Sequence, residues 1–461
     1  MKRFITTLKN IYNIEELRKR ILYTLGIVLV YRIGAYIALP GVDVQALAQT
    51  SFTSGSREGL LGLLDMFSGG AFSNASIFAL GIMPYISASI VVQLLTLVVP
   101  YFQRLQKEGE SGRKKITQMT RFLTIAVTAL QGPAYIANLI NTVGTNSGVF
   151  HTLTGEPIAG GVIPWSFTIV SVLILISSTL FIMWLGERIT EKGIGNGISL
   201  IIMVGIIARL PFALAAEFIS KVAETGNGGL VVFLIELLLL VGVILLTILL
   251  VQGTRKVPVQ YAKRVVGNKQ YGGQRQYLPL KVNAAGVMPI IFAQAIMFLP
   301  LTIMGFAQPS EAISSFAAAM TDPVGFWYNF IFGVMIILFT YFYTAITFNP
   351  QQIAEDMKKN GGFIPGIKPG KKTVEYIDTI ISRITLPGSI FLAFVAIMPA
   401  FARIFGINSQ FAQFFGGTSL LIMVGVVLDT LQQIESHLLM RHYDGLTKTG
   451  RIKGRSALPV G

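Results

Sequence analysis

The basic residues of this chain are confined almost entirely to alternate gaps between its long apolar stretches. Of the 37 lysines and arginines in 461 residues, 32 lie in every second gap. In multi-pass membrane proteins, the loops richest in lysine and arginine are those that stay in the cytoplasm. The pattern therefore predicts a polytopic membrane protein whose termini and basic loops share the cytoplasmic side. Five basic residues depart from the pattern: Arg32, Arg57, Arg209, Lys221 and Arg403.

The composition supports a membrane protein. Hydrophobic residues make up 52% of the chain and charged residues 13%, whereas a soluble domain is about 25% charged. A helix needs roughly 20 apolar residues to cross a hydrocarbon core about 30 Å thick. Ten stretches meet this requirement: Ile21–Ala38, Ala75–Val99, Phe122–Val143, Val162–Leu185, Ile194–Phe212, Leu230–Val251, Ala284–Phe306, Phe326–Phe348, Ile384–Ala402 and Phe414–Ile434. An even number of spans leaves both termini on one side, in agreement with the charge pattern.

The ten spans predict one membrane domain over residues 1–461. Five spans fall in an N-terminal half, residues 1–216, and five in a C-terminal half, residues 217–440, followed by a basic tail at 441–461. If two halves with an odd number of spans share a fold, the second is inverted relative to the first. The topology permits such an inverted repeat, although the sequence itself shows no clear internal repeat.

Two loops of the C-terminal half, at about residues 252–283 and 349–383, are long, polar and basic. The second contains the run GGFIPGIKPG, Gly361–Gly370, whose glycines and prolines exclude a regular helix. We expect a shaped turn at the tip of a cytoplasmic protrusion. An ordinary solvated connector is the alternative.

A short apolar segment, Leu60–Asn74, follows the first span and is interrupted by Gly69 and Gly70. Stretches of this length are typical of re-entrant or interfacial segments. Broken backbone at membrane depth is tolerated only inside protein or beside a water-filled cavity. A re-entrant half-helix would therefore need a cavity around it, whereas an interfacial helix on the outer surface fits the local sequence equally well.

Isoleucines four residues apart occur at Ile82 and Ile86, and again at Ile198 and Ile202. This spacing places each pair on one face of a helix. Taken alone, such pairs are typical of packing or lipid-facing side chains.

Few ionisable residues fall within the spans, the clearest being Arg32, Glu236 and Asp429. Charges inside a membrane are candidates for function, but these three form neither a proton relay nor an ion site. The sequence has no cysteine, and it shows no phosphate-binding glycine loop, metal-ligand cluster or nucleophile–base pair. It therefore predicts neither an enzyme nor a cofactor or metal site.

Six stretches resemble the SecY family of protein-conducting channels, in the family's order and spacing, and together they cover nearly the whole chain. They are MFSGGAFSNASIFALGIMPYISASIVVQLL (Met66–Leu95), KEGESGRKKI (Lys107–Ile116), GIGNGISLII (Gly193–Ile202), NAAGVMPIIFA (Asn283–Ala293), FNPQQIAEDMKKNGGFIPGIKPGKKT (Phe348–Thr373) and FGGTSLLIMVGVVLD (Phe415–Asp429). The resemblance implies an all-α polytopic membrane protein. Its ten transmembrane helices would form two inverted five-helix halves around a central hourglass pore, closed by a re-entrant plug half-helix.

Carried over position by position, the resemblance implies three sets of site residues. The pore ring comprises Ile82, Ile86, Ile198, Ile202, Ile291 and Ile422, and the plug, at about residues 60–74, contains Leu64, Met66, Phe67, Gly69, Gly70 and Phe72. A ring of branched apolar side chains offers water no hydrogen bonds, so an empty pore can dewet and seal. Gln93 and Gln131 are candidates for a lateral gate. The gate would lie between the second and third spans on one side and the seventh and eighth spans on the other. Plain interhelical hydrogen bonding of the two glutamines is the alternative.

The resemblance also implies partners. The two basic loops correspond to the family's docking site for the ribosome and the SecA motor ATPase, with Lys263, Arg264 and Lys368 near the tips. Lys368 stands where an arginine is expected, which keeps the charge but loses the planar fork for bidentate contacts. SecE would clamp the two halves, and SecG would complete a heterotrimer.

The predicted function is passage of unfolded secretory polypeptides through a channel in the cell inner (plasma) membrane. The channel would recognise signal sequences in nascent polypeptides and release hydrophobic segments sideways into membrane lipid. It would perform no covalent chemistry, and SecA or the ribosome would supply the energy. A secondary transporter of small solutes is the alternative, but its midplane site needs convergent polar groups, where this chain has isoleucines. A third interpretation is an insertase that only delivers membrane proteins laterally.

Overall fold

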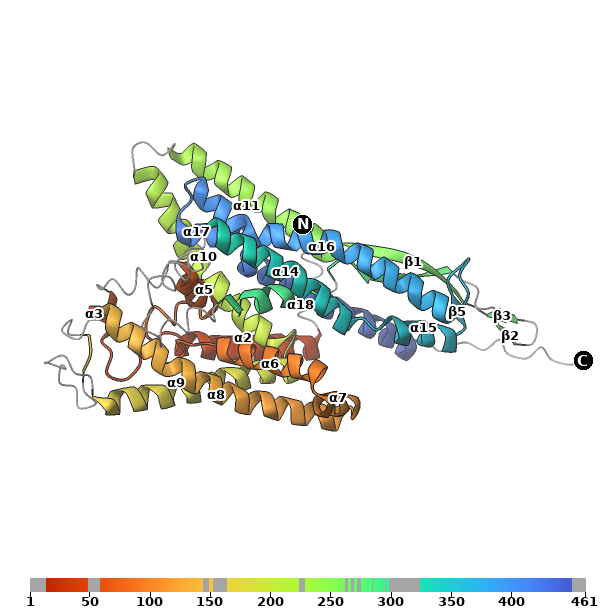
Figure 1. Cartoon of the computed structure of the whole chain (residues 1–461), viewed down its shortest axis with the longest axis horizontal. Coiled ribbons are helices and arrows are strands. Elements are labelled where there is room, and N and C mark those ends of the chain that lie inside the picture. Colours follow the sequence, from red (N-terminus) through yellow and green to blue (C-terminus); the bar gives the residue numbers. More distant parts are fainter. Residues whose placement is uncertain are drawn as a thin grey trace, which may run out of the picture.

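Long helices aligned with the longest axis of the molecule form most of the structure, and a small β-sheet lies beside one end of them (Figure 1). We call this end the basic end and the other the opposite end. This structure is a computed structural model. It describes residues 14–48, 59–143, 149–151, 164–223, 229–261, 264–266, 269–271, 275–283, 285–294, 296–297 and 324–449.

Seven described helices are long and apolar enough to cross a membrane. They are α8 (Glu110–Val143), α9 (Trp165–Lys192), α10 (Gly197–Ala223), α11 (Gly229–Gln252), α14 (Phe326–Thr347), α16 (Lys371–Ile404) and α18 (Gly417–Thr449). α6 (Met83–Val98) and α7 (Pro100–Lys107), which meet at a bend of 99°, are long and apolar enough only when taken together, and they make an eighth span if the bent pair is counted as one. Two expected spans remain. The first corresponds to α2 (Glu15–Gly34), whose first turns are charged. Of the expected seventh span, the structure describes helical residues 288–294 and 296–297.

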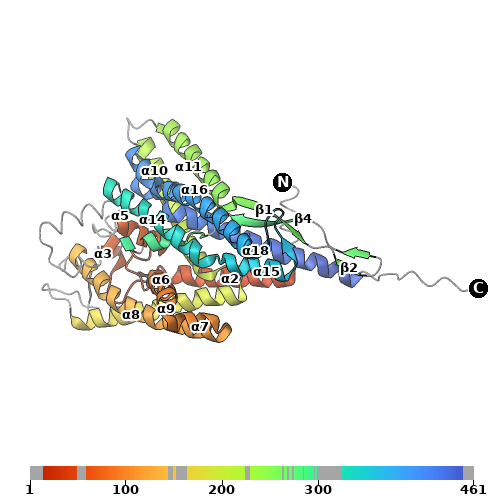
Figure 2. The same ribbon diagram turned by 45° about the vertical axis from the view of Figure 1, so that its right-hand side comes forward.

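The two halves run in opposite directions. α2, the first helix of the N-terminal half, runs from the basic end to the opposite end, and α11 runs the other way (Figures 1 and 2). The half boundary expected at 216/217 falls inside α10, which continues to Ala223. Glu217 and Lys221 prolong the helix because they are paired there with buried partners instead of facing water.

Several elements extend beyond the apolar stretches or fall short of them. α8 begins at Glu110 instead of Phe122, and α16 begins at Lys371 instead of Ile384, since charged residues continue these helices into water. α6 begins at Met83 instead of Ala75, with Pro84 in its first turn. Residues 68–82 form consecutive turns interrupted by one bridging residue, and they are largely buried within the protein.

The basic loops contain β-structure that the sequence analysis did not predict. A three-stranded sheet has the order β4 (Arg275–Lys281), β1 (Thr254–Tyr261), β5 (Gly362–Phe363), and β2 (Arg264–Val266) pairs with β3 (Lys269–Tyr271). Pairing of β1 with both β4 and β5 is antiparallel and joins the two basic loops. Gly361–Gly370 contains β5 and turns and no helix, in agreement with the expected shaped turn.

Short elements complete the fold at the two ends. α3 (Val44–Ala48), α5 (Gly59–Phe67), α17 (Ser409–Ala412) and the 3₁₀ turn η1 (Gln413–Phe415) lie toward the opposite end, and α15 (Pro350–Lys359) lies at the basic end. One apolar cluster joins α2, α5, α9, α10 and α18 across the two halves. A second lies mainly in the C-terminal half and includes Ile90 of α6. The two halves therefore share a continuous apolar contact at the centre of the molecule.

Candidate functional site

A very small apolar cavity lies where the two halves meet. Its volume is about 10 Å³, near the smallest size that holds one water molecule. The lining residues are Phe67, Met83, Ile86, Ile202, Ile291, Gln294 and Ile422. Four of the six isoleucines expected in the ring thus surround one narrow, mainly apolar constriction, with Phe67 of the plug segment (residues 60–74) against them.

The other two isoleucines lie beside this constriction. Ile82 is buried at the start of α6 in the same apolar cluster. Ile198 also packs against the cluster, and a Cβ built at Gly186 of α9 would lie 3.0 Å from its Cγ1. The structure therefore brings all six residues into one region but places only four around the cavity.

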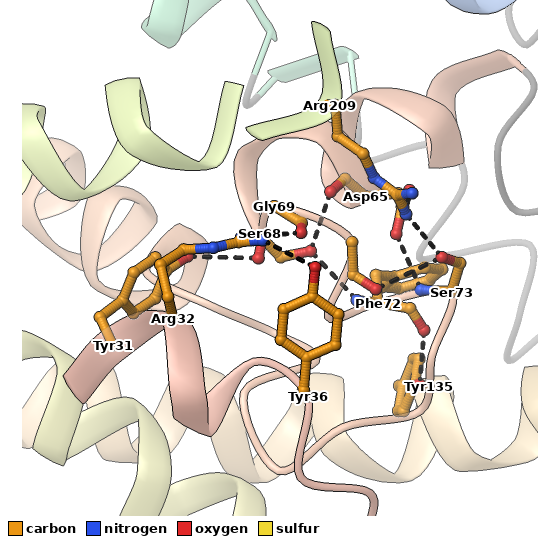
Figure 3. A network of polar contacts seen from close by, with 11 residues as sticks. Tyr31, Arg32, Tyr36, Asp65, Ser68, Gly69, Phe72, Ser73, Tyr135 and Arg209 are labelled. Carbon is orange, nitrogen blue, oxygen red and sulfur yellow. Dashed lines mark hydrogen bonds and ion pairs between the residues drawn. The ribbon is translucent and has the colours of Figure 1, made fainter. Parts of the chain in front are cut away.

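A salt bridge fixes the plug segment to α10. Arg209 pairs with Asp65, and its Nη2 also donates to Ser73 Oγ at 2.8 Å (Figure 3). Asp65 in turn accepts a hydrogen bond from the backbone N–H of Ser73 at 2.8 Å. The Asp65 side chain is 4% exposed and that of Arg209 is 17% exposed. Removing one member of this buried ion pair would leave an uncompensated charge, so each member depends on the other while the plug segment is seated.

Side chains from α2 and α8 hold the backbone of the same segment (Figure 3). Arg32 Nη1 donates to the carbonyl of Gly69 at 3.0 Å, and the Tyr31 hydroxyl donates to that of Ser68 at 3.2 Å. From α8, the Tyr135 hydroxyl donates to the carbonyl of Phe72 at 2.9 Å. These contacts give buried non-helical carbonyls the partners they need away from water.

The polar contacts described between the plug segment and transmembrane helices come from the N-terminal half, through α2, α8 and α10. Toward the C-terminal half, the segment presents mainly apolar side chains, although Asp65 lines a cavity with Gln410 and Gln413. Phe67 meets Ile291 and Ile422 at the constriction, and Met66 lines a cavity with Phe414. The segment is thus bonded to one half and packed against the other.

Two glycines allow this close packing. A Cβ on Gly205 of α10 would lie 2.6 Å from the carbonyl oxygen of Phe67, closer than any real contact. Gly70 has φ = +95°, and a Cβ there would lie 2.7 Å from Arg209 Cζ. The helix, the arginine and the plug backbone can approach so closely because these side chains are absent.

The predicted plug residues all lie in or beside this arrangement. Met66, Phe67 and Phe72 are buried, and the partly buried Leu64 packs in a cluster with Phe72. Sequence reasoning missed Asp65 and Arg209 as site residues. The available signal was their isolation, since Asp65 is the one acid in an apolar segment and Arg209 breaks the charge segregation.

The gate and docking candidates lie apart from the constriction. Gln93 of α6 is exposed and Gln131 of α8 is partly buried. Lys368 is exposed in the turn after β5, where its carbonyl accepts from Thr373 Oγ1 at 3.0 Å. Arg264 begins β2, and Lys263 lies outside the described residues.

Lys221, another exception to the charge pattern, forms a second buried cluster. Its Nζ lies 3.3 Å from Glu236 Oε1 of α11, 3.6 Å from Glu217 Oε1 and 2.9 Å from the carbonyl of Gly406. The second carboxylate oxygen of Glu217 accepts from the N–H of Asn408 at 2.9 Å. This cluster accounts for Glu236 and joins α10 and α11 to the loop after α16.

The remaining charged candidates differ in their surroundings. Arg403 lines a cavity of about 60 Å³ with Gln294 and Gln413. Asp429 is exposed on α18, and Arg57 lies outside the described residues. Among the described residues, no group of three or more histidine, cysteine, aspartate or glutamate side chains could hold a metal ion.

Comparison with known sequences identifies close relatives along nearly the full length. The sequence model of the SecY family matches residues 76–431. The chain is 42% identical over 451 residues to the protein translocase subunit SecY of Streptomyces coelicolor, an alignment that covers 96% of this chain and 100% of that protein. It is 44% identical over 459 residues to the SecY subunit of Mycobacterium bovis, covering 96% and 99%.

Solved structures with the same fold are channels of this kind. A protein-conducting channel aligns with a TM-score of 0.64 at 16% identity, covering 94% of this chain and 95% of that one. A SecY whose plug domain is described as stabilising the closed state and maintaining a membrane seal aligns with a TM-score of 0.62, at the same identity and coverage. Sec61 from a canine ribosome–channel complex aligns with a TM-score of 0.60, again at 16% identity and with the same coverage. At this identity, the structures establish the fold.

Proposed function

This chain belongs to the SecY family, and we propose that unfolded secretory polypeptides cross the membrane through its isoleucine constriction. The chain is the pore-forming subunit of a protein translocase and not a small-solute transporter. The observation that carries the proposal is the small, mainly apolar cavity between the halves, where Phe67 meets Ile86, Ile202, Ile291 and Ile422. Apolar walls make no specific contacts, so they exclude ions when closed and accommodate any side chain when open.

The plug segment closes this route in the state described. Its seat combines the Asp65–Arg209 pair with apolar packing of Phe67 against the constriction. Separation of the two halves would remove the apolar packing first, because the polar contacts to transmembrane helices that the structure describes lie on one side. Departure of the plug would then require the polar contacts to break.

Hydrophobic segments would leave sideways, between α6 and α8 on one side and residues 288–297 and α14 on the other. α6 meets the C-terminal half through the apolar side chains of Ile86, Ile90 and Leu94. Lipid or an apolar signal sequence can replace such contacts at little cost, because association within a membrane has no hydrophobic driving force. Gln93 and Gln131 are the proposed polar residues of this lateral gate.

The sheet and the turn after β5 are the proposed docking surface for the SecA ATPase or the ribosome, either of which would supply the energy. Arg255, Lys256 and Lys368 are exposed there, and the similar Sec61 channel was solved in a ribosome–channel complex. Lys263 and Arg264 belong to the same proposed surface. Lys368→Glu is expected to weaken binding of either partner to channel-containing vesicles, more strongly at low salt.

We further propose a heterotrimer with SecE and SecG in the cell inner membrane, with both termini in the cytoplasm. The support for the membrane and its orientation is the apolar surface of helices such as α11, with Leu238 and Leu249 72% and 74% exposed, together with the 32 segregated basic residues. Within this complex, SecE would clamp the halves.

Reconstitution tests this function against the insertase interpretation. Vesicles containing the chain with SecE and SecG receive SecA, ATP and either a soluble secretory precursor or a single-span membrane protein. We expect the precursor to become protected from added protease, and to lose that protection when its signal sequence is deleted. Integration of the membrane protein without any protected soluble precursor would instead support the insertase.

A further inference from the structure

Arg209 lies on the pore-facing side of α10. It follows Ile202 by seven residues, which places it on the same helical face about 10 Å further toward the opposite end. Gly205 lies between them and touches the plug backbone. α10 therefore presents an isoleucine, a glycine and an arginine in succession along the route that a polypeptide takes.

The surroundings of Arg209 confirm that it lies between the two halves. It lines a cavity of about 30 Å³ together with Asp65 and Met66 of the plug segment. Gln410, Gln413 and Phe414 of the C-terminal half line the same cavity. Across the plug segment, Arg32 of α2 bonds to Gly69 and is held by Tyr36 in the turn after α2, with 3.1 Å between Nη2 and the Tyr36 hydroxyl oxygen.

Departure of the plug changes the local charge. Among the described residues, Asp65 is the one acid that pairs with these two arginines. It pairs with Arg209, whereas Arg32 bonds to a carbonyl. Asp65 belongs to the moving segment. With the plug seated, Arg32, Arg209 and Asp65 together carry one net positive charge. Without it, the two arginines remain on transmembrane helices that stay in place, and the net charge beside the pore rises to two.

We propose that Arg32 and Arg209 make the crossing rate depend on the charge of the translocating chain. This inference rests on the proposed function. The seated plug covers them. Its departure exposes two positive charges at the outer mouth of the pore, which let acidic segments of the polypeptide pass faster than basic ones. These residues thereby act on the substrate in the open state, in addition to holding the plug in the closed one.

The size of this effect follows from simple electrostatics. A passing charge comes within roughly 6–10 Å of each guanidinium in a wet, narrow pore, where the effective dielectric constant lies below that of bulk water. The expected difference between acidic and basic segments is about threefold to tenfold in crossing rate. Raising the salt concentration should shrink it, because the screening length becomes shorter than the distance across the pore.

The test uses three versions of one precursor that differ in a short block of glutamate, glutamine or lysine within the mature region. Crossing rates are measured in vesicles that contain the complete complex. The Arg32→Gln/Arg209→Gln variant is compared with the wild type and with Lys19→Gln/Arg20→Gln, which removes two exposed charges from the other end of α2. In the wild type and this control, we expect the glutamate block to cross at least about threefold faster than the lysine block.

The ratio of these two rates should fall close to one in Arg32→Gln/Arg209→Gln. Arg209→Lys separates charge from plug seating, since lysine keeps the charge but cannot contact Asp65 and Ser73 as a planar fork. We expect Arg209→Lys to leak ions and still keep the ratio. An unchanged ratio in the double-arginine variant, or loss of the ratio in Arg209→Lys, would overturn the inference. Failure of the glutamine-block precursor to cross the wild-type channel would instead contradict the proposed function.

Discussion

Asp65 occupies a position where one carboxylate serves two purposes. It neutralises Arg209 of α10 and accepts the backbone N–H of Ser73, which folds the plug segment back on itself. These partners are far apart in the sequence, since Arg209 follows Asp65 by 144 residues. No local pattern predicts such a pair, so the sequence identified the segment and its apolar residues but not the salt bridge that seats it.

Asp65→Ala is expected to open the channel to ions. It leaves the largely buried guanidinium of Arg209 without its counter-charge, at a cost of roughly 3 kcal/mol or more. Asp65→Asn retains an oxygen that can accept from Ser73 and Arg209, and should leak less. The conductance of planar bilayers that contain each variant tests whether Asp65→Ala leaks more than Asp65→Asn. Equal conductance of wild type and Asp65→Ala would show that the pair does not hold the plug.

Gly205→Ala is expected to unseat the plug without any change of charge. The added methyl group meets the backbone carbonyl of Phe67 at 2.6 Å, and such overpacking costs about 1–3 kcal/mol. Gly132→Ala in α8 is the matched control, because its Cβ makes an ordinary contact of 3.5 Å with Val172. Ion leakage should rise in the first variant and not in the second, and equal leakage in both would contradict the close packing.

At the scale of elements, apolar length predicted most of the long helices that the structure describes but not where they end. α8 and α16 are each 34 residues long, because charged turns continue them beyond the apolar stretch. The sheet was missed because β1 and β5 belong to different loops, and their pairing across about a hundred residues is a tertiary contact. The isoleucine ring was predicted from family resemblance, since its spacing alone is equally typical of lipid-facing residues.

Helix α18 supplies Ile422 to the constriction, and polarity on that face should weaken the seal. Ile422→Asn adds a second amide, besides that of Gln294, to a small and mainly apolar cavity and thereby favours water there. We expect more ion leakage and acceptance of precursors with defective signal sequences. Leu431→Asn, on the exposed opposite face of the same helix, is the control and should change neither property. Wild-type leakage and selectivity in Ile422→Asn would remove Ile422 from the seal.

At the scale of the whole molecule, the segregated charge and its exceptions have different causes. The 32 basic residues in alternate gaps carry the proposed orientation of the chain in the membrane. Three of the five exceptions bind specific partners inside the protein: Arg32 and Arg209 hold the plug, and Lys221 joins α10 and α11 to the loop after α16. Intramembrane charge is costly, and these contacts provide the compensation.

Crosslinking from the constriction to a stalled secretory chain tests the route most directly. Photoreactive residues are placed at Ile82, Ile202 and Ile422, and at Leu238 and Leu249 on the exposed surface of α11 as controls. We predict crosslinks to the stalled chain from the three isoleucine positions and crosslinks to lipid from the two leucine positions. Contact of the chain with the leucine positions and with none of the three isoleucines would contradict a polypeptide path through the constriction.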